Sequence, residues 1–227
     1  MSKKQIMNQT DAMARAARAK KVTWVGFWIN VVLSVAKIIA GIVGRSGAMI
    51  ADGVHSISDF VTDIIVIVFI GVSAKGENTR FRYGHGKFET FATMLISFAL
   101  FAVAVGLFWT SFSQIVDALN GKVLPRPEMV ALVMAFVSVV AKEWLFHYTR
   151  VAGEQMNTMA LVANAWHHRS DAFSSIAVLV GIGCAMFLGE RWRVLDPIAA
   201  ATVSVFIALV AYRLAMPSIR ELLEVAL

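Results

Sequence analysis

Long apolar stretches alternate with short polar connections along the whole chain. Because about 20 apolar residues are needed to cross a bilayer as a helix, six stretches qualify, at 22–44, 47–72, 88–113, 127–149, 158–187 and 194–216. Pro125 and Pro127 break the chain before the fourth stretch, and Asp196-Pro197 has the form of a cap and first-turn proline opening the sixth. The pattern predicts an all-α polytopic membrane protein with six transmembrane helices.

The composition supports this prediction. The chain is 58% hydrophobic and only 16% charged, whereas a soluble domain has about 25% charged residues. Its mean hydropathy is +0.69. The single cysteine, Cys184, excludes an intramolecular disulfide framework and any metal site built from several thiolates.

Basic residues outside the six stretches predict the orientation in the membrane. The formal net charge of +6 does not form one basic patch, so we expect no nucleic-acid partner. Most of the basic residues belong to the N-terminus, the second–third connection and the C-terminus, which the positive-inside rule places in the cytoplasm. We therefore expect a cytoplasmic basic segment at 1–21, a transmembrane domain at 22–216 and the start of a cytoplasmic C-terminal segment at 217–227. Residues 11–21 fit a short interfacial helix or a solvated tail equally well.

A pattern of His and Asp occurs twice inside these apolar stretches. His55 and Asp59 lie four residues apart in the second stretch, and His167 and Asp171 do so in the fifth. On an α-helix this spacing puts both side chains on one face. A carboxylate inside a membrane is costly and therefore indicates function. Two imidazoles and two carboxylates suit a divalent transition metal, so these four residues are the candidate metal ligands.

The predicted topology brings the two pairs together. The second and fifth spans run in opposite directions, so the two pairs face each other antiparallel. Each motif begins roughly 8–10 residues into its span, or about 12–15 Å deep at 1.5 Å per residue. This depth is close to the middle of the bilayer, where transporters commonly place their binding sites.

Three further polar residues share the faces of these pairs. Asp52 and Asp63 lie on the face of His55 and Asp59. They either orient the histidines or line a water-filled path to the site, and Asp52 could alternatively lie near the external mouth. Asn164 occupies the position in the fifth stretch that matches Asp52, and we assign it a supporting role at most.

The other polar residues carry weaker signals. His85 lies between two glycines in the second–third connection, and is either a loop metal ligand or part of turn structure or a helix cap. Lys37 is interpreted as a snorkelling or paired residue and Lys142 as an interfacial one.

Four segments together resemble one known family. They begin at Ala51, Tyr83, Ala165 and Asp196, and read Ala51-Asp-Gly-Val-His55-Ser-Ile-Ser-Asp59, Tyr83-Gly-His85-Gly-Lys87-Phe-Glu89, Ala165-Trp-His167-His-Arg-Ser-Asp171 and Asp196-Pro197. From about Trp24 onward the chain resembles the cation diffusion facilitators, which are proton-coupled exporters of divalent metals. The six-span layout agrees with that family.

The resemblance implies several properties. His55, Asp59, His167 and Asp171 would form a tetrahedral transport site. Members with His in both motifs look like zinc carriers, whereas manganese-type members tend to carry Asp or Asn instead. The family works as homodimers, and a loop Lys often pairs with an acid after the sixth span, which here suggests Lys87 with Glu224 for gating or dimer contact. Most members continue into a cytoplasmic metal-binding domain, so we expect a truncated chain or a member that lacks it.

We therefore expect a secondary active transporter, and no enzyme, that exports a divalent transition metal in exchange for protons. Zn²⁺ is the favoured substrate, and Co²⁺, Cd²⁺ and Fe²⁺ remain open. Metal binding displaces protons from carboxylate and imidazole ligands, which couples the two fluxes. The expected location is the bilayer of a bacterial cytoplasmic (inner) membrane. The alternatives are a metal sensor or scaffold without transport, a channel, and a haem protein with two histidine ligands.

Overall fold

The computed structural model describes residues 3–59, 86–156 and 159–223. These residues form helices and short connections without any strand, which confirms the predicted all-α class. The elements, in chain order, are α1 (Lys3–Val43), a helical segment at 47–59, α3 (Gly86–Leu119), α4 (Met129–Gln155), α5 (Met159–Phe187), the 3₁₀ helix η1 (Glu190–Val194) and α6 (Leu195–Leu222).

Five of the described helices are long and apolar enough to cross a membrane. The spans are Lys21–Val43, Thr93–Leu119, Met129–Gln155, Asn164–Phe187 and Glu190–Leu222. They correspond to the first, third, fourth, fifth and sixth predicted spans. The predicted second span, 47–72, is described only as far as Asp59. The protein is thus a helical integral membrane protein.

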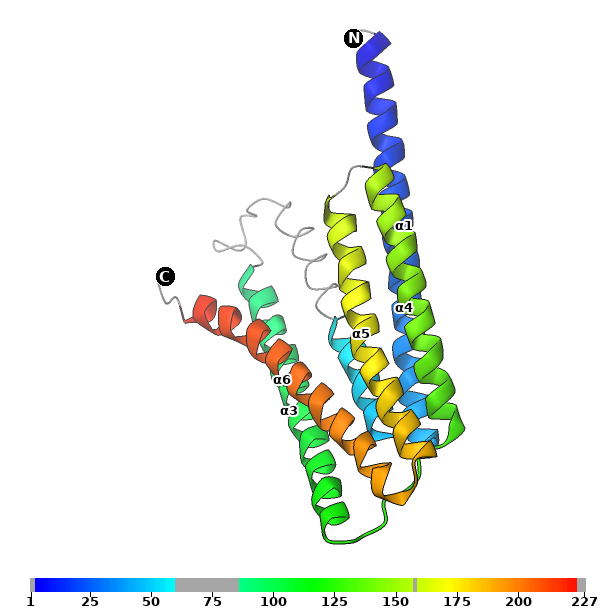
Figure 1. Ribbon diagram of the computed structural model, residues 1–227. Coiled ribbons are helices and arrows are strands. Elements are labelled where there is room, and N and C mark those ends of the chain that lie inside the picture. Colours follow the sequence, from blue (N-terminus) through cyan, green and yellow to red (C-terminus); the bar gives the residue numbers. More distant parts are fainter. Residues whose placement is uncertain (1–2, 60–85, 157–158, 224–227) are drawn as a thin grey trace.

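Helix α1 begins well before the membrane. It is one continuous helix of 41 residues, and its N-terminal part projects beyond the other helices in Figure 1. Residues 11–21 are therefore neither a separate interfacial helix nor an unstructured tail. They continue the first span without a break.

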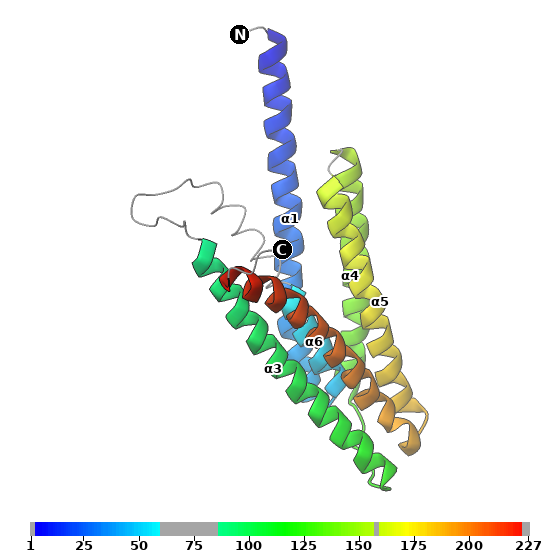
Figure 2. The same ribbon diagram turned by 90° about the vertical axis from the view of Figure 1, so that its left-hand side faces the viewer.

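The helices form two groups. Helix α4 packs along α5 and against α1, whereas α3 and α6 pack against each other. Figures 1 and 2 show that α6 starts beside the end of α5 and then diverges from it toward its own C-terminus. The segment 47–59 follows α1 after a tight turn and lies between the two groups (Figure 1).

Three connections meet at the end of the molecule opposite the N-terminus (Figure 1). The backbone N–H of Glu128 donates to the Gly44 carbonyl at 2.8 Å. The Arg193 guanidinium donates to the Leu124 carbonyl at 2.9 Å. These bonds tie the turn after α1, the α3–α4 connection and η1 to one another, so the start of the segment 47–59 is held in place.

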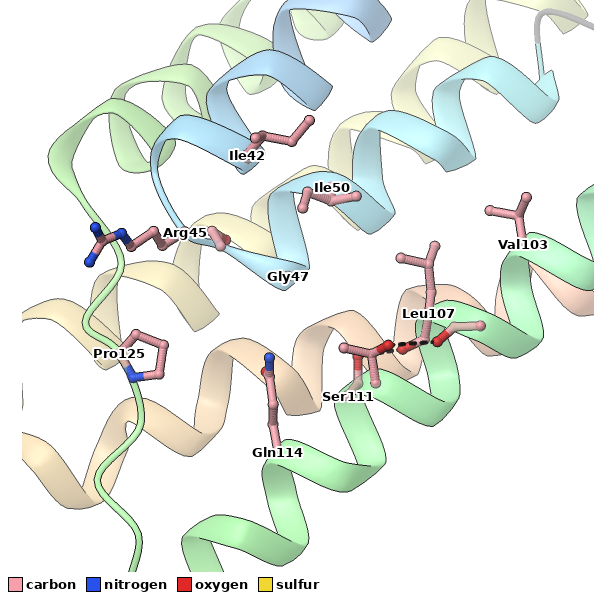
Figure 3. Close-up of a pocket in the computed structure, with 13 residues that line it drawn as sticks. Ile42, Arg45, Gly47, Ile50, Val103, Leu107, Ser111, Gln114 and Pro125 are labelled. Atoms are coloured by element: carbon pink, nitrogen blue, oxygen red, sulfur yellow. Dashed lines mark hydrogen bonds between the residues drawn. The ribbon is translucent and has the colours of Figure 1, made fainter.

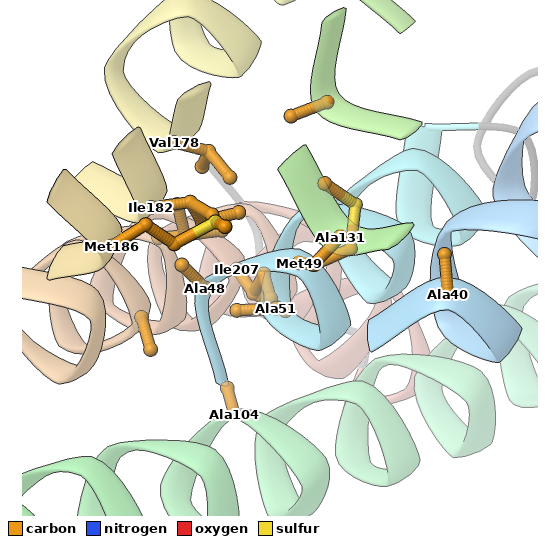
Figure 4. Close-up of a cluster of buried hydrophobic side chains, with 13 residues drawn as sticks. Ala40, Ala48, Met49, Ala51, Ala104, Ala131, Val178, Ile182, Met186 and Ile207 are labelled. Carbon is orange, nitrogen blue, oxygen red and sulfur yellow. The ribbon is translucent and has the colours of Figure 1, made fainter. Parts of the chain in front are cut away.

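Small side chains fill the core near this end (Figure 4). We call this cluster the alanine seam. Its members come from every described transmembrane segment and are Ala40, Ala48, Met49, Ala51, Ala104, Ala131, Ala135, Val178, Ile182, Met186, Ala200, Val203 and Ile207. Small residues allow the helix backbones to approach closely. A Cβ atom on Gly44, for example, would lie only 2.7 Å from the Ala131 Cβ atom.

Large apolar side chains point outward. Trp109, Phe136 and Phe173 are 71%, 60% and 62% exposed. In a helix of a soluble protein such residues would face the core. Their outward position fits helices whose outer faces contact lipid.

Candidate metal site

Each His-x-x-x-Asp pair lies on one face of its helix. His55 Nε2 is 3.8 Å from Asp59 Oδ2 on the segment 47–59, and His167 Nε2 is 3.9 Å from Asp171 Oδ1 on α5. These distances follow from the four-residue spacing, which places two side chains one turn apart. Each helix therefore offers one imidazole and one carboxylate in the same direction.

Three of the four predicted ligands come together in space. His55, Asp59 and Asp171 each contribute one ligand atom, and these atoms lie within 4.8 Å of one another. In a tetrahedral zinc site with bonds of about 2.0–2.1 Å, neighbouring ligand atoms are roughly 3.4 Å apart. A small side-chain movement thus brings this group to metal-binding distances.

Two atoms of this group have free hydrogen-bonding capacity. Within the described part of the chain, the buried atoms His55 Nδ1 and Asp59 Oδ2 have no hydrogen-bond partner. A buried polar atom without a partner costs about 1–3 kcal/mol, and such atoms usually have a functional explanation. Here they are the two atom types that a transition metal binds.

His167 lies at the rim of this group. Its side chain is 44% exposed, and it is not among the three residues that cluster within 4.8 Å. Asp59 nevertheless lies within electrostatic range of His167, as well as of His55, Asp171 and Lys142. The fourth predicted ligand is therefore near the site but more accessible than the other three.

Asp171 forms a buried ion pair that the sequence did not predict. Lys142 Nζ donates to Asp171 Oδ2 at 2.8 Å, and the Lys142 side chain is only 2% exposed. The interpretation of Lys142 as interfacial is therefore wrong. It lies 13 residues from either end of α4 (Met129–Gln155), which extends beyond the predicted span of 127–149.

A second buried ion pair lies beside the site. Lys37 Nζ is 2.8 Å from Asp52 Oδ2, with both side chains 1% exposed. Lys37 also donates to Ser56 at 3.1 Å and to Ser175 at 3.3 Å, and the Ser175 hydroxyl lies 3.2 Å from Asp52. Of the two interpretations of Lys37, the paired one is confirmed. This network joins α1, the segment 47–59 and α5.

The network continues to α4 through a pair of hydroxyls. Ser138 Oγ and Ser175 Oγ are 3.4 Å apart, and Ser175 lies one turn after Asp171 on α5. Ser175 thus links α5 to α4 as well as to Asp52. From the sequence alone, Ser138 had no assigned role and Lys142 was placed at the interface. Their only signal was that they are polar residues inside an apolar stretch.

Asn164 contacts the neighbouring histidine rather than the site. Its side-chain amide nitrogen lies 3.5 Å from His168 Nε2. His168 is only 2% exposed, and its Nδ1 has no hydrogen-bond partner among the described residues. A Cβ on Gly26 of α1 would lie 3.7 Å from His168 Nε2, so His168 faces α1 and not the His167 face.

Asp196 positions the helix that carries His55 and Asp59. The sequence predicted it as the cap of the sixth span, but it lies in the first turn of α6, whose N-cap is Val194. Its carboxylate accepts hydrogen bonds from the Ser46 hydroxyl and from the backbone N–H of Gly47. Asp196 therefore caps the N-terminus of the segment 47–59, where a negative charge is favourable, and the prediction was wrong about which helix it caps.

Several predicted residues lie outside the described residues. Asp63, His85 and Glu224 belong to the undescribed ranges, and the side chain of Lys87, in the first turn of α3, is likewise not described. The path role of Asp63, the loop metal site at His85 and the Lys87–Glu224 pair stay predictions.

A pocket of about 540 Å³ opens between α1, the segment 47–59 and α3 (Figure 3). It contains none of the four predicted ligands. Ile42, Ile50, Val103 and Leu107 give it largely apolar walls (Figure 3). Since these helices border lipid, we assign it no part in metal binding.

Comparison with known proteins identifies the family. The family model described as "Cation efflux transmembrane domain" matches residues 23–223. The chain is 33% identical to the manganese efflux system protein MneP of Bacillus subtilis over 94% of its length. It is 32% identical to the magnetosome protein MamB of a Magnetospira strain over 95% of its length. It is 34% identical to metal tolerance protein C1 of Arabidopsis thaliana over 92% of its length.

The chain is shorter than these relatives. It spans 71% of each of the two bacterial proteins and 46% of the plant protein. The match nevertheless covers all the described helices from the first span onward. It confirms the resemblance to the cation diffusion facilitators that the motifs indicated. The chain therefore belongs to the cation efflux family through its transmembrane domain.

Proposed function

We propose that this protein is a secondary active transporter that carries a divalent transition metal, preferentially Zn²⁺, out of the cytoplasm in exchange for protons. The observation that carries the proposal is the convergence of His55, Asp59 and Asp171 within 4.8 Å. Membership of the cation efflux family supports it. His167, beside Asp171, completes a set of two nitrogens and two oxygens.

The ligand set favours zinc. Imidazole and carboxylate in a four-coordinate arrangement suit Zn²⁺, and two carboxylates balance the charge of a dication in a medium of low dielectric constant. Histidine in both motifs points the same way. Because the Bacillus subtilis relative is named for manganese efflux, Mn²⁺ is the main competitor to test, together with Co²⁺, Cd²⁺ and Fe²⁺.

Proton exchange follows from the same ligands. Imidazole and carboxylate bind metal only in their deprotonated forms, so metal and protons compete for the site. When the metal leaves, two carboxylates remain close together in a buried place, which favours their protonation. Alternating exposure of one site to the two sides of the membrane then exchanges metal for protons.

The remaining features of the proposal concern the surroundings of the site. We place the protein in a bacterial cytoplasmic membrane with both termini in the cytoplasm, working as a homodimer. Lys87 and Glu224 form an ion pair at the cytoplasmic face. A charge swap that restores no activity lost in the single variants would refute that pairing.

Flux measurements in proteoliposomes with an imposed proton gradient test the central proposal. Asp59→Asn is a cleaner probe than a change at Asp171, because Asp171 has Lys142 as a buried partner. The matched control is His147→Ala. His147 also pairs with an acid one turn away, Glu143 at 3.2 Å, but it is 66% exposed and lies outside the site.

The expected result is zinc flux coupled to proton flux in the wild type and in His147→Ala, and loss of both fluxes in Asp59→Asn. Zinc flux at the wild-type rate in Asp59→Asn would refute the assignment of the metal site. Zinc binding without flux in the wild type would instead favour a sensor or scaffold. A Soret band in the purified protein would favour the haem alternative.

A further inference from the structure

The two buried lysines of the helix bundle have different surroundings. Lys37 has three partners, namely Asp52, Ser56 and Ser175. Lys142 has one hydrogen-bond acceptor among the described residues, Asp171 at 2.8 Å. An ammonium group has three donors. The Lys37 ammonium is therefore fully engaged, whereas the Lys142 ammonium depends on a single carboxylate.

The two acids also differ in what surrounds them. Asp52 is outside the group of converging ligand atoms, whereas Asp171 is part of it together with His55 and Asp59. One oxygen of Asp171 accepts from Lys142, and the other faces His167 at 3.9 Å. The same carboxylate is thus shared between an internal cation and the candidate metal site.

The charges of these groups mean that the sharing of Asp171 affects how strongly a dication is held. Two carboxylates, Asp59 and Asp171, carry a formal charge of −2, and Lys142 contributes +1. A dication that enters the site meets both the attraction of the carboxylates and the repulsion of a buried ammonium 2.8 Å from one of them. Since this pair is only 2% and 8% exposed, water screens the repulsion weakly.

On this basis we propose that Lys142 is an internal competitor of the transported metal. Its ammonium competes with the dication for the Asp171 carboxylate, and it replaces part of the metal's charge when the metal leaves. The inference rests on the proposed transport function and adds to it a residue outside the four ligands. Lys142 lowers the affinity of the site and thereby speeds metal release.

The flexible side chain of lysine suits this role. Its ammonium sits on four methylene groups and can move several ångströms without any shift of the helix. Lys37 is less suited to the same part, because its ammonium would have to leave three partners at once, Asp52, Ser56 and Ser175. We therefore assign Lys37–Asp52 to the fixed framework and Lys142–Asp171 to the exchangeable contact.

Calorimetric titration of the purified full chain in detergent with Zn²⁺, at one fixed pH, tests the proposal. Lys142→Met keeps the length of the side chain and removes its charge, and should bind Zn²⁺ at least about tenfold more tightly than the wild type. Lys142→Arg keeps the charge and should bind Zn²⁺ no more tightly than the wild type. In proteoliposomes with saturating zinc, Lys142→Met should turn over more slowly because release is slower.

Lys37→Met is the matched control, since it also removes a buried ammonium from an ion pair with aspartate. It should not raise the zinc affinity. An equal rise in Lys37→Met and Lys142→Met would overturn competition at Asp171, because it would show a general effect of lost positive charge. Size-exclusion chromatography must show that each variant is folded, and Lys142→Gln serves if Lys142→Met is not.

The outcomes separate this inference from the proposed function. If the wild type binds zinc and folded Lys142→Met or Lys142→Gln binds it equally or more weakly, the proposed role of Lys142 is wrong. The proposed transport function is not affected by that result. Absence of zinc binding in the wild type and in all Lys142 variants overturns both. Binding that appears or tightens in the neutral variants supports both.

Discussion

Asp196 and Gly47 are 149 residues apart in the chain, yet the Asp196 carboxylate accepts the backbone N–H of Gly47 at 2.8 Å. The same carboxylate accepts the Ser46 hydroxyl. The helix that carries His55 and Asp59 is therefore capped by the first turn of another transmembrane helix. Its position depends on α6.

Removal of this cap should destabilise the protein. Asp196→Ala loses both hydrogen bonds and leaves the Gly47 N–H without its acceptor, which we expect to lower the free energy of unfolding by about 1–3 kcal/mol. Chemical denaturation in detergent measures it. As a control, Asp117→Ala breaks an exposed ion pair with Lys122 and should cost less than about 0.5 kcal/mol. Equal effects would show that the Asp196 contact is not a cap.

Gly53 is a position of close approach between α1 and the segment 47–59, beside the Lys37–Asp52 pair. A Cβ atom there would lie 2.7 Å from Ile38 Cγ1 and 3.2 Å from Lys37 Cβ. Gly53→Ala should therefore cost about 1–3 kcal/mol of stability, because the two helices must separate. Gly106→Ala is the matched control, since nothing lies within 4 Å of its Cβ position, and alanine favours helix there. Thermal unfolding measures the stability of the two variants in parallel. A larger loss of stability in Gly106→Ala than in Gly53→Ala would contradict the close approach at Gly53.

The Lys37–Asp52 pair should behave as a structural unit. Lys37→Met leaves the Asp52 carboxylate, which is 1% exposed, without its ammonium partner, and we expect a loss of about 3–5 kcal/mol of stability. Because the penalty comes from the unpaired charge, the double variant Lys37→Met/Asp52→Asn should recover most of that loss. A double-mutant cycle of unfolding free energies measures the coupling. Additive losses would contradict the pairing.

Metal preference should depend on the nitrogen ligands. His55→Asp replaces an imidazole with a third carboxylate, and carboxylate oxygen suits Mn²⁺ better than imidazole does. We expect the ratio of Zn²⁺ to Mn²⁺ affinity to fall, by roughly tenfold or more. Competition between the two metals in binding assays measures this ratio. The control His147→Asp, outside the site, should leave it unchanged, and a similar shift in both variants would reject His55 as a ligand.

The spacing of the sequence was sufficient for the local geometry of the site. A separation of four residues determines that His55 and Asp59 share a face, because helix geometry is local. The antiparallel arrangement of the two motifs followed from counting spans. That Asp171 joins His55 and Asp59 within 4.8 Å agrees with that arrangement.

Contacts between helices were beyond the reach of the sequence. The interpretation of Lys142 as interfacial was wrong, because α4 continues to Gln155, beyond the predicted end at residue 149, and the Lys142 ammonium pairs with Asp171. Asp196 has the form of a cap for its own helix, yet its carboxylate accepts hydrogen bonds from Ser46 and Gly47, in the turn after α1. Both outcomes depend on packing, which hydrophobic periodicity does not report.

The alanine seam affects how much energy is needed to move the helix groups apart. Burial of a methylene group contributes about 0.8 kcal/mol, and most members of the seam present one methyl group where leucine would present several carbons. Separation of α3 and α6 from the other helices therefore exposes little apolar surface for each contact that is lost. The protein combines a tightly fitted interface with a low resistance to opening, a property that interlocked bulky side chains could not provide.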